Sequence, residues 1–314
     1  MAAAAIEFQG VTKVYKRLFS DEKIAALSDV SFQVAPGEVC AFLGPNGAGK
    51  TTSISILMGF FFANSGEIRV LGYPPGDVRA KAQIGFLPEN FAFYKYLTAP
   101  KLLRLHMALA GRHSPGSAAL IADLLKKVKL TGYENLKIGK YSRGMVQRIG
   151  IAQALLCDPQ LVILDEPTSG LDPAGRREVL QILAGLKAEG KTVFLSSHIL
   201  PEVEQICDRV VIIDRGKLLR TGRLEDMLAS GNRVEIAADR APDGFEQSPA
   251  GVGAVVERGA HGVRILVDAA RKRETVESLW AAGCDVTAMN PLRSTLEELF
   301  LKELKEVDPG GGAQ

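Results

Sequence analysis

One stretch decides the fold: Gly44-Pro45-Asn46-Gly47-Ala48-Gly49-Lys50-Thr51-Thr52. It matches the P-loop pattern, in which a glycine, four variable residues, a second glycine, a lysine and a serine or threonine follow one another. The apolar run Val39–Leu43 precedes it and the helical pattern of residues 53–58 follows it, which predicts strand, glycine loop and helix. Glycines let backbone N–H groups converge on an anion, and the dipole of the following helix adds to the attraction. The sequence therefore predicts a phosphate-binding loop in an α/β domain.

Two residues of this loop are predicted to act on a nucleotide directly. Lys50 is expected to reach the outer phosphates, and the hydroxyl of Thr51 is expected to bind Mg²⁺. The alternative is a glycine-rich turn without a ligand. Four fixed positions recur by chance in about one chain in a hundred of this length, and the strand and helix around them favour the ligand-binding interpretation.

Length and composition limit the class of protein. The chain has 314 residues, enough for one large domain and a smaller one. Its 38 basic and 36 acidic residues give a net charge of +2, so no bulk field would draw nucleic acid or an anionic membrane. No apolar run approaches the roughly 20 residues that span a bilayer, and the first five residues lack the features of a signal peptide. We expect a cytoplasmic protein with no nucleic-acid partner.

The cysteines give no sign of a metal site or a disulfide framework. Cys40, Cys157, Cys207 and Cys284 lie far apart and show no paired metal-ligand spacing. We expect reduced thiols that pack as small hydrophobic side chains.

Two acidic residues end a second buried strand. Leu161–Leu164 is a continuous apolar run, typical of a parallel strand buried on both faces. It brings Asp165 and Glu166 to its carboxyl end, where open α/β sheets bind ligands. Asp165 suits a metal-binding role opposite Thr51, and Glu166 suits acceptance of a proton from an attacking water.

Two further polar residues follow predicted strands. Glu89 comes shortly after Ile84–Leu87, where a polar side chain can reach a bound metal and its water; the alternative is an ordinary exposed loop glutamate. His198 follows the apolar run of residues 191–197. A histidine at this end of the sheet can contact the γ-phosphate or the attacking water, and the alternative is a structural histidine.

Aromatic residues mark three places. Tyr15 is predicted to stack on an adenine ring, with a contribution of about 1–3 kcal/mol; the alternative is a half-buried strand residue. The loop of residues 91–96 holds Phe91, Phe93, Tyr94 and Tyr96. We expect this loop to form a partner surface, with core packing as the alternative. The run Phe60, Phe61 and Phe62 is expected to pack in the core.

A second anion-attracting helix start is predicted at Ser142. Ser142 is a good N-cap, Gly144 in the first turn permits close approach to the backbone, and Arg143 adds a positive charge. Taken alone, the pattern also fits a plain capped helix. A further helix is predicted to start with Asp172 as N-cap and Pro173 as its first residue.

Together these residues resemble the ATP-binding subunit of an ABC transporter, over about residues 6–227. The matching motifs are Walker A at Gly44 to Thr52, Walker B with its glutamate at Leu161 to Glu166, the D-loop at Ser169 to Asp172, the H-loop at His198, and the signature motif at Ser142 and Gly144. The resemblance implies ATP and Mg²⁺ as ligands. It also implies Thr51, Glu89 and Asp165 at the metal, and Lys50, Glu166 and His198 in hydrolysis.

The resemblance further implies partners. Two copies are expected to pair head to tail, so that Ser142, Arg143, Gly144 and Met145 of one copy close on ATP held by the other. A separate permease is expected to contact the region from Glu89 to Tyr96, which would place the subunit on the inner face of the cell membrane. The family likeness is to bacterial exporter subunits.

Some positions depart from the usual family pattern. The signature reads Tyr141-Ser142-Arg143-Gly144-Met145 where Leu-Ser-Gly-Gly-Gln is common. Met145 cannot make the hydrogen bonds of a glutamine, while Arg143 adds a charge. Glu89 stands where glutamine is customary, and its carboxylate adds negative charge near the metal.

The pattern of the chain changes near Ser230. We expect an ATP-binding domain over residues 1–230, with a helical insertion at about residues 95–160, and a small α+β accessory domain over residues 231–314 that ends in a flexible tail. The element order β-α-β-β-α-β predicts a ferredoxin-like module, with a short first helix over residues 243–247. A dimerising or regulatory role is expected for it.

Two other functions compete with transport. A soluble ABC-type ATPase of DNA repair, chromosomes or ribosomes usually carries a long coiled coil, zinc insertions or two cassettes, and the sequence shows none of these. A small-molecule P-loop kinase would leave the signature helix and His198 without a purpose. The sequence favours an ATPase that powers transport, and it does not reveal the transported substrate.

Overall fold

The computed structural model describes residues 4–16, 23–112, 116–229, 233–248, 251, 254–259, 262–292 and 295–307. The chain divides into two compact units, Met1–Leu224 with Glu303–Gln314, and Glu225–Lys302. The predicted domain boundary at residues 230–231 and the predicted flexible tail at residues 309–312 lie outside the described residues.

The larger unit is built on a six-stranded sheet in the order β5-β6-β7-β3-β8-β9. Its strands are β5 (Ile84–Leu87), β6 (Leu161–Leu164), β7 (Thr192–Ser197), β3 (Val39–Leu43), β8 (Arg209–Asp214) and β9 (Lys217–Arg223). All neighbours pair in parallel except β8 and β9. Strands β3, β6 and β7 are buried along their whole length, as their apolar sequences predict. The carboxyl ends that carry the predicted motifs therefore lie at one edge of the sheet.

A three-stranded antiparallel sheet in the order β2-β1-β4 completes the core of this unit. Its strands are β1 (Ile6–Lys16), β2 (Lys23–Val34) and β4 (Ser65–Val70). Phe8 and Phe32 stack with ring centroids 4.5 Å apart, and Phe32 lies 5.5 Å from Phe42 of β3. Helix α1 (Lys50–Leu57) adds Ile54, Ile56 and Leu57 to the same buried cluster. The P-loop helix is thus fixed by the core from both sheets.

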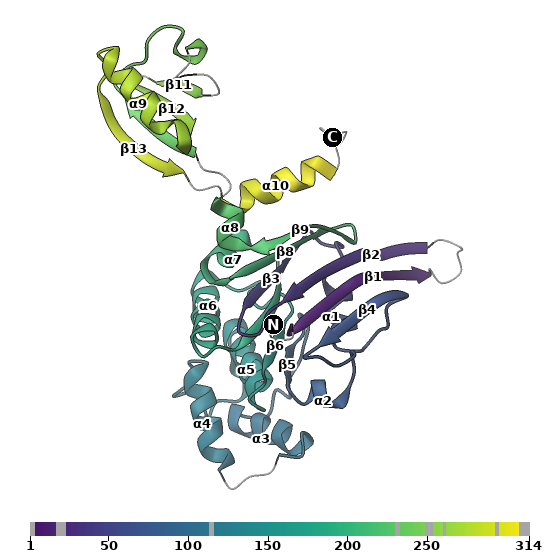
Figure 1. The fold of residues 1–314 in the computed structure, drawn as a ribbon. Helices are drawn as coiled ribbons and strands as arrows, with labels where there is room; N and C mark the ends of the chain where they lie inside the picture. The colour runs from purple at the N-terminus through teal and green to yellow at the C-terminus, as the bar shows by residue number, and fades with distance from the viewer. Residues whose placement is uncertain are drawn as a thin grey trace. The chain divides into compact units, whose positions relative to one another are not determined.

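Helices surround the sheet and form an insertion (Figure 1). They are α2 (Val78–Lys81), α3 (Ala99–Leu109), α4 (Ser117–Lys127), α5 (Arg143–Leu155), α6 (Pro173–Ala188) and α7 (Leu200–Ile206), with a 3₁₀ turn at Ile138–Lys140. Helix α8 (Leu224–Ala229) starts at Leu224, and its other residues belong to the smaller unit. Helices α3 and α4 each bury one apolar face, as their leucine spacing predicts. The predicted start of α6 is confirmed, because the Gly175 N–H donates to the Asp172 carboxylate at 3.2 Å and Pro173 follows at the first turn.

The prediction that Phe60, Phe61 and Phe62 pack in the core is wrong. Their exposed fractions are 56%, 47% and 77%. Helix α1 ends at Leu57, and Gly59 then turns the chain with a φ of +70°. A Cβ on Gly59 would lie 2.5 Å from the Cα of Gly76, so the backbone of this turn packs directly on another backbone segment. The three rings therefore lie on the surface.

The smaller unit contains a four-stranded antiparallel sheet in the order β11-β12-β10-β13. Its elements are β10 (Arg233–Ala238), β11 (Val255–Gly259), β12 (Gly262–Asp268), α9 (Lys272–Ala281) and β13 (Val286–Leu292), with 3₁₀ turns at Phe245–Gln247 and Ala269–Arg271. Helix α10 (Leu296–Val307) starts in this unit, and its residues from Glu303 on belong to the larger unit. The helix predicted over residues 243–247 is a single 3₁₀ turn, because Gly244 adopts the left-handed conformation and only three residues follow it. The ferredoxin-like assignment stays a prediction.

The structure also bears on the cysteines and on membrane crossing. Cys40, Cys157, Cys207 and Cys284 are free thiols, and all but Cys157 are buried. Among the helices of the described residues, none has the length and apolar character that spanning a bilayer requires.

Candidate functional site

The loop between β3 and α1 presents a row of unpaired backbone donors. Within the described part of the chain, no acceptor takes the N–H groups of Gly47, Gly49, Lys50, Thr51 and Thr52. Gly47 and Gly49 have φ values of +80° and +110°, in the left-handed region that favours glycine. A Cβ on Gly44 would lie 2.3 Å from the Ile213 carbonyl oxygen, so only glycine fits against β8. The loop therefore has the geometry of an anion site.

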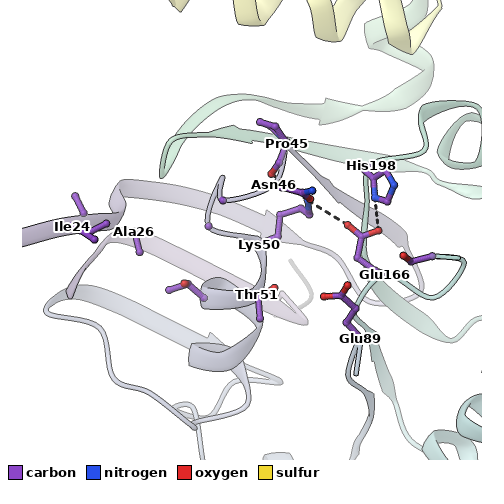
Figure 2. Close-up of a pocket in the computed structure, with 14 residues that line it drawn as sticks. Ile24, Ala26, Pro45, Asn46, Lys50, Thr51, Glu89, Glu166 and His198 are labelled. Carbon is purple, nitrogen blue, oxygen red and sulfur yellow. Dashed lines mark hydrogen bonds and ion pairs between the residues drawn. The ribbon is translucent and has the colours of Figure 1, made fainter. Parts of the chain in front are cut away.

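Lys50 lies at the centre of this loop and is buried, with an exposed fraction of 7%. Its ammonium donates to the Gly44 carbonyl at 2.7 Å and pairs with Glu166 Oε1 at 3.3 Å. Figure 2 shows the ion pair between Lys50 and Glu166 across the site. Because a buried ammonium needs charged or polar partners, these contacts hold it where a phosphate would compete for it.

Glu166 contacts both Lys50 and His198. Its Oε2 lies 2.8 Å from Nδ1 of His198, which comes from the end of β7 (Figure 2). Its backbone has a φ of +49°, which is uncommon for a residue with a side chain and costs on the order of 1 kcal/mol. The surrounding hydrogen bonds hold the residue in this conformation. Such strain in a motif residue fits a carboxylate that must point in one direction.

Ser196 connects the two acidic residues that follow β6. Its hydroxyl donates to Asp165 Oδ1 at 2.6 Å and accepts from the Glu166 backbone N–H at 2.8 Å. Ser196 is fully buried in β7, next to β6. The sequence analysis missed this residue, and the only signal for it is a pair of serines at the end of an otherwise apolar strand.

Asp165 is buried near two other negative charges, those of Glu89 and Glu166. Burial raises the pKa of its carboxyl, and the negative charges of Glu89 and Glu166 raise it further. The Ser196 hydrogen bond and the Lys50 ammonium oppose this rise in pKa. A carboxylate in this position would be stabilised by a bound cation.

Lys50, Glu166 and His198 line a cleft of about 310 Å³, which we call the P-loop cleft (Figure 2). Its lining includes most of the predicted residues, namely Pro45, Asn46, Gly47, Gly49, Lys50, Thr51, Thr52, Glu89, Glu166 and His198. It also includes Ile24, Ala25, Ala26 and Ser169, which the sequence analysis did not select for the site. Gly44, Ala48 and Asp165 lie in the same loop and strand end without being part of the lining.

The donor set fits Mg²⁺ that arrives with a nucleotide. The described residues contain no cluster of three or more His, Cys, Asp and Glu side chains able to hold a metal ion alone. Thr51, Asp165 and Glu89 offer a hydroxyl and carboxylates near the loop. Mg²⁺ is commonly bound through one or two carboxylates, waters and substrate phosphates, which matches this arrangement.

Tyr15 lies beside the cleft and not in its lining. It is half-buried in β1 and pairs directly with Ile24 of β2, which does line the cleft. Its ring meets Phe61 edge to face, with centroids 6.1 Å apart. The predicted stacking on adenine stays a prediction.

The signature residues are not part of the lining of the P-loop cleft of their own chain. The Met145 N–H donates to the Ser142 hydroxyl at 3.2 Å, which confirms the predicted N-cap of α5. Ser142 and Arg143 are exposed, Met145 is half-buried, and Gly144 is buried against Gly175 of α6. The guanidinium of Arg143 lies over the D-loop, because a Cβ on Gly170 would be 2.4 Å from its central carbon.

The aromatic loop after Glu89 is divided between core and surface. Phe91 and Phe93 are half-buried, with ring centroids 5.2 Å apart, and Phe91 lies against Gly150 of α5. Tyr94 and Tyr96 have exposed fractions of 57% and 67% and contact each other at 5.8 Å. Core packing therefore describes Phe91 and Phe93 in part, and the partner surface stays a prediction.

Comparison with known proteins identifies the family. The family model for ABC transporters matches residues 27–169. An ABC transporter ATP-binding protein of Synechocystis sp. is 38% identical and covers 97% of this chain and 86% of its own length. Nod factor export ATP-binding protein I of Rhizobium etli is 36% identical over 73% of this chain and 71% of its own.

A solved structure agrees with these relatives. It is a dimeric ATP-binding cassette in a post-hydrolysis state, bound to ADP and Pi, with 27% identity and a TM-score of 0.62 over 70% of this chain and 98% of that one. These comparisons confirm the P-loop fold and the resemblance drawn from the motifs. They also favour the transport function over the soluble ABC-type ATPase and the small-molecule kinase. This chain belongs to the family of ABC transporter ATP-binding proteins and is a subunit that binds and hydrolyses ATP with Mg²⁺.

Proposed function

We propose that two copies of this chain close head to tail on two molecules of ATP. The P-loop of one copy binds the triphosphate, and Ser142, Arg143, Gly144 and Met145 of the other copy cap it. The observation that carries this proposal is the exposed start of α5, outside the cleft of its own chain, where the described residues give Arg143 no ion-pair partner. Helix N-termini attract anions, so a second copy would bring a complementary surface to the phosphates.

Within each site, the residues of this chain have separate roles. Lys50 exchanges its contacts with Gly44 and Glu166 for phosphate oxygens. Glu166, freed from the ammonium, accepts the proton of the attacking water, and His198 Nδ1 holds its other oxygen in place. Thr51, Asp165 and Glu89 would hold the Mg²⁺ ion that arrives with the nucleotide, which would supply positive charge near the phosphate oxygens. Tyr15 stacks on the adenine.

The transport partner is proposed to be a separate permease. Tyr94 and Tyr96 place two large exposed rings in the loop that begins beside Glu89. Exposed aromatic pairs of this kind suit an interface. Through this loop, closure at the nucleotide would be passed to the permease at the inner face of the membrane. Export is the proposed direction, since a relative of this chain is named for Nod factor export.

The smaller unit is proposed to be an accessory module. Its buried core, formed by residues such as Ile236, Ile265 and Leu279, is its own. We propose a dimerising or regulatory role for it, over the predicted domain of residues 231–314.

Analytical ultracentrifugation of the Glu166→Gln variant tests the dimer. With ATP and Mg²⁺ we expect a dimer, because the nucleotide is held and not consumed, and without nucleotide we expect a monomer. The Glu166→Gln/Lys50→Ala double variant is the control and should stay monomeric with ATP. A Glu166→Gln protein that sediments as a monomer at saturating ATP would contradict the proposal.

Co-purification of a polytopic membrane protein, in contrast to ribosomes or DNA, tests the transport partner.

A further inference from the structure

The surface turn after α1 touches the residue assigned to the adenine. From these contacts we infer that Phe61 and Lys13 are positioning residues that hold the Tyr15 ring ready to stack on the base. The inference rests on the proposed role of Tyr15. It also explains why an aromatic residue stands at position 61 although its exposed fraction is 47%.

The three side chains form one cluster. The rings of Tyr15 and Phe61 meet edge to face, with centroids 6.1 Å apart and planes at 87°. The Lys13 ammonium lies over both rings, 5.1 Å from the Tyr15 centroid and 5.9 Å from the Phe61 centroid. Edge-to-face pairs and cations over aromatic faces are both favourable geometries. Tyr15 is thus contacted from two sides before any nucleotide binds.

Three hydrogen bonds, two of them made by side chains, fix the turn that carries Phe61. The Lys13 ammonium donates to the Phe62 carbonyl at 2.6 Å, and the Val14 N–H donates to the Asn64 side chain at 2.8 Å. On the other side, the Phe60 N–H donates to the Ser55 carbonyl of α1 at 2.9 Å. The turn is therefore tied both to β1, which carries Tyr15, and to the helix that begins at the P-loop.

The cluster stands at the edge of the P-loop cleft. Tyr15 is the direct cross-strand partner of Ile24, and Ile24 lines the cleft. Directly opposed residues of an antiparallel pair share one face of the sheet. With Lys13 over one face of the Tyr15 ring, the opposite face is the one that a base can stack on. Holding the ring in advance lowers the ordering cost of binding.

Binding to the full chain with two probes tests this inference. One probe is a non-hydrolysable ATP analogue with Mg²⁺, and the other is inorganic tripolyphosphate with Mg²⁺, which has no base. We expect Phe61→Ala to weaken binding of the ATP analogue by about 2- to 10-fold, the range expected for one lost aromatic pair. Tripolyphosphate binding should not change, because the P-loop is intact. Phe61→Tyr should bind both probes like the parent.

Phe62→Ala is the matched control in the same turn. Its side chain has an exposed fraction of 77%, the turn keeps the backbone carbonyl that Lys13 contacts, and both probes should bind as they do to the parent. In a double-mutant cycle, Tyr15→Ala/Phe61→Ala should bind the analogue no more weakly than Tyr15→Ala alone, because Phe61 acts through Tyr15.

Each other outcome has a distinct meaning. If Tyr15→Ala weakens binding of the analogue and Phe61→Ala does not, the positioning role is overturned while the base-stacking role of Tyr15 stands. An equal loss of analogue and tripolyphosphate in Phe61→Ala would indicate a general structural effect and would also overturn it. If Tyr15→Ala binds the analogue like the parent, the proposed role of Tyr15 itself is wrong, and the inference is overturned with it.

Discussion

The starts of helices α1 and α5 are both predicted to attract phosphate, and their surroundings differ sharply. At the start of α1, the ammonium of Lys50 is buried and pairs with Glu166 of the same chain. At the start of α5, Ser142 and Arg143 are exposed, and the guanidinium of Arg143 lies over Gly170. One helix start is surrounded by its catalytic partners, and the other faces outward.

This difference is what the proposed head-to-tail pairing requires, because in that pairing a single chain holds half of each site. The residues that bind and hydrolyse meet at the carboxyl ends of adjacent strands, where the fold itself aligns them. The residues that we propose cap the nucleotide are not part of the lining of the P-loop cleft of their own chain. The following predictions test that division, from the largest expected effect to the smallest.

Glu166→Gln should have the largest effect on turnover. Removing a general base costs roughly 10²- to 10⁴-fold in rate, whereas ATP binding through Lys50 should persist. Phosphate release and ATP affinity, measured on the same preparation, check both parts. Hydrolysis at the parental rate would show that Glu166 is not the base.

Lys50→Ala should remove most nucleotide binding. The lysine is expected to give up its contacts with Gly44 and Glu166 for two phosphate oxygens, each worth about 1.5 kcal/mol, so affinity should fall roughly 100-fold. Calorimetry with ATP and Mg²⁺ measures this loss. Unchanged affinity would show that Lys50 does not bind the phosphates. The comparison between the starts of α1 and α5 would then lose its first half.

Ser196→Ala should slow hydrolysis by about 10-fold, since it removes a hydrogen bond to each of two acidic residues. The loss of the hydroxyl leaves Asp165 and the Glu166 backbone without their shared partner. Ser197→Ala is the control, because the Ser197 hydroxyl accepts only from the Ile199 N–H among the described contacts. Equal rates for both variants would show that Ser196 does not organise the acids.

Arg143→Gln should have the smallest effect, and the change should be seen in dimer formation instead of ATP binding. We expect ATP binding to the monomer to stay as in the parent, because Arg143 lies outside the cleft. In the Glu166→Gln background, dimer formation with ATP should weaken by about 10-fold through the loss of one charge-assisted hydrogen bond. Sedimentation over a range of protein concentrations measures this. A loss of ATP affinity in the monomer would instead place Arg143 in its own chain's site.

Local sequence predicted the strand ends well and the surface turn poorly. The bounds of β5 and β6 follow from apolar runs that stop at Pro88 and Asp165. The exposure of Phe60 to Phe62 could not be predicted, because it depends on the contact of Gly59 with Gly76, which is tertiary. The short 3₁₀ turn at Phe245–Gln247 was expected as a helix, since a five-residue segment carries little periodicity.

Within the site, motif residues could be predicted and supporting residues could not. Lys50, Glu166 and His198 belong to ordered motifs, and the fold brings them together. Ser196 and Ile24 are brought to the site by the pairing of their strands with neighbouring strands, so the structure was needed to find them. The outward position of Ser142 also required the structure, because a capped helix start looks the same in sequence whichever way it faces.

The central claim is that each site combines the P-loop of one chain with the signature helix of another. Mixing two inactive variants tests it most directly. Lys50→Ala keeps an intact signature helix, and Ser142→Glu keeps an intact P-loop while placing a negative charge where the phosphates should be capped. Lys50→Ala mixed with Glu166→Gln is the control, because both changes fall in the same half-site.

We predict that the Lys50→Ala and Ser142→Glu proteins each hydrolyse little ATP alone and regain activity when mixed, since the mixed dimer has one complete site. The control mixture should stay inactive. Failure of the first mixture to regain activity while Lys50→Ala and Ser142→Glu form mixed dimers, or full activity of Ser142→Glu alone, would contradict the account.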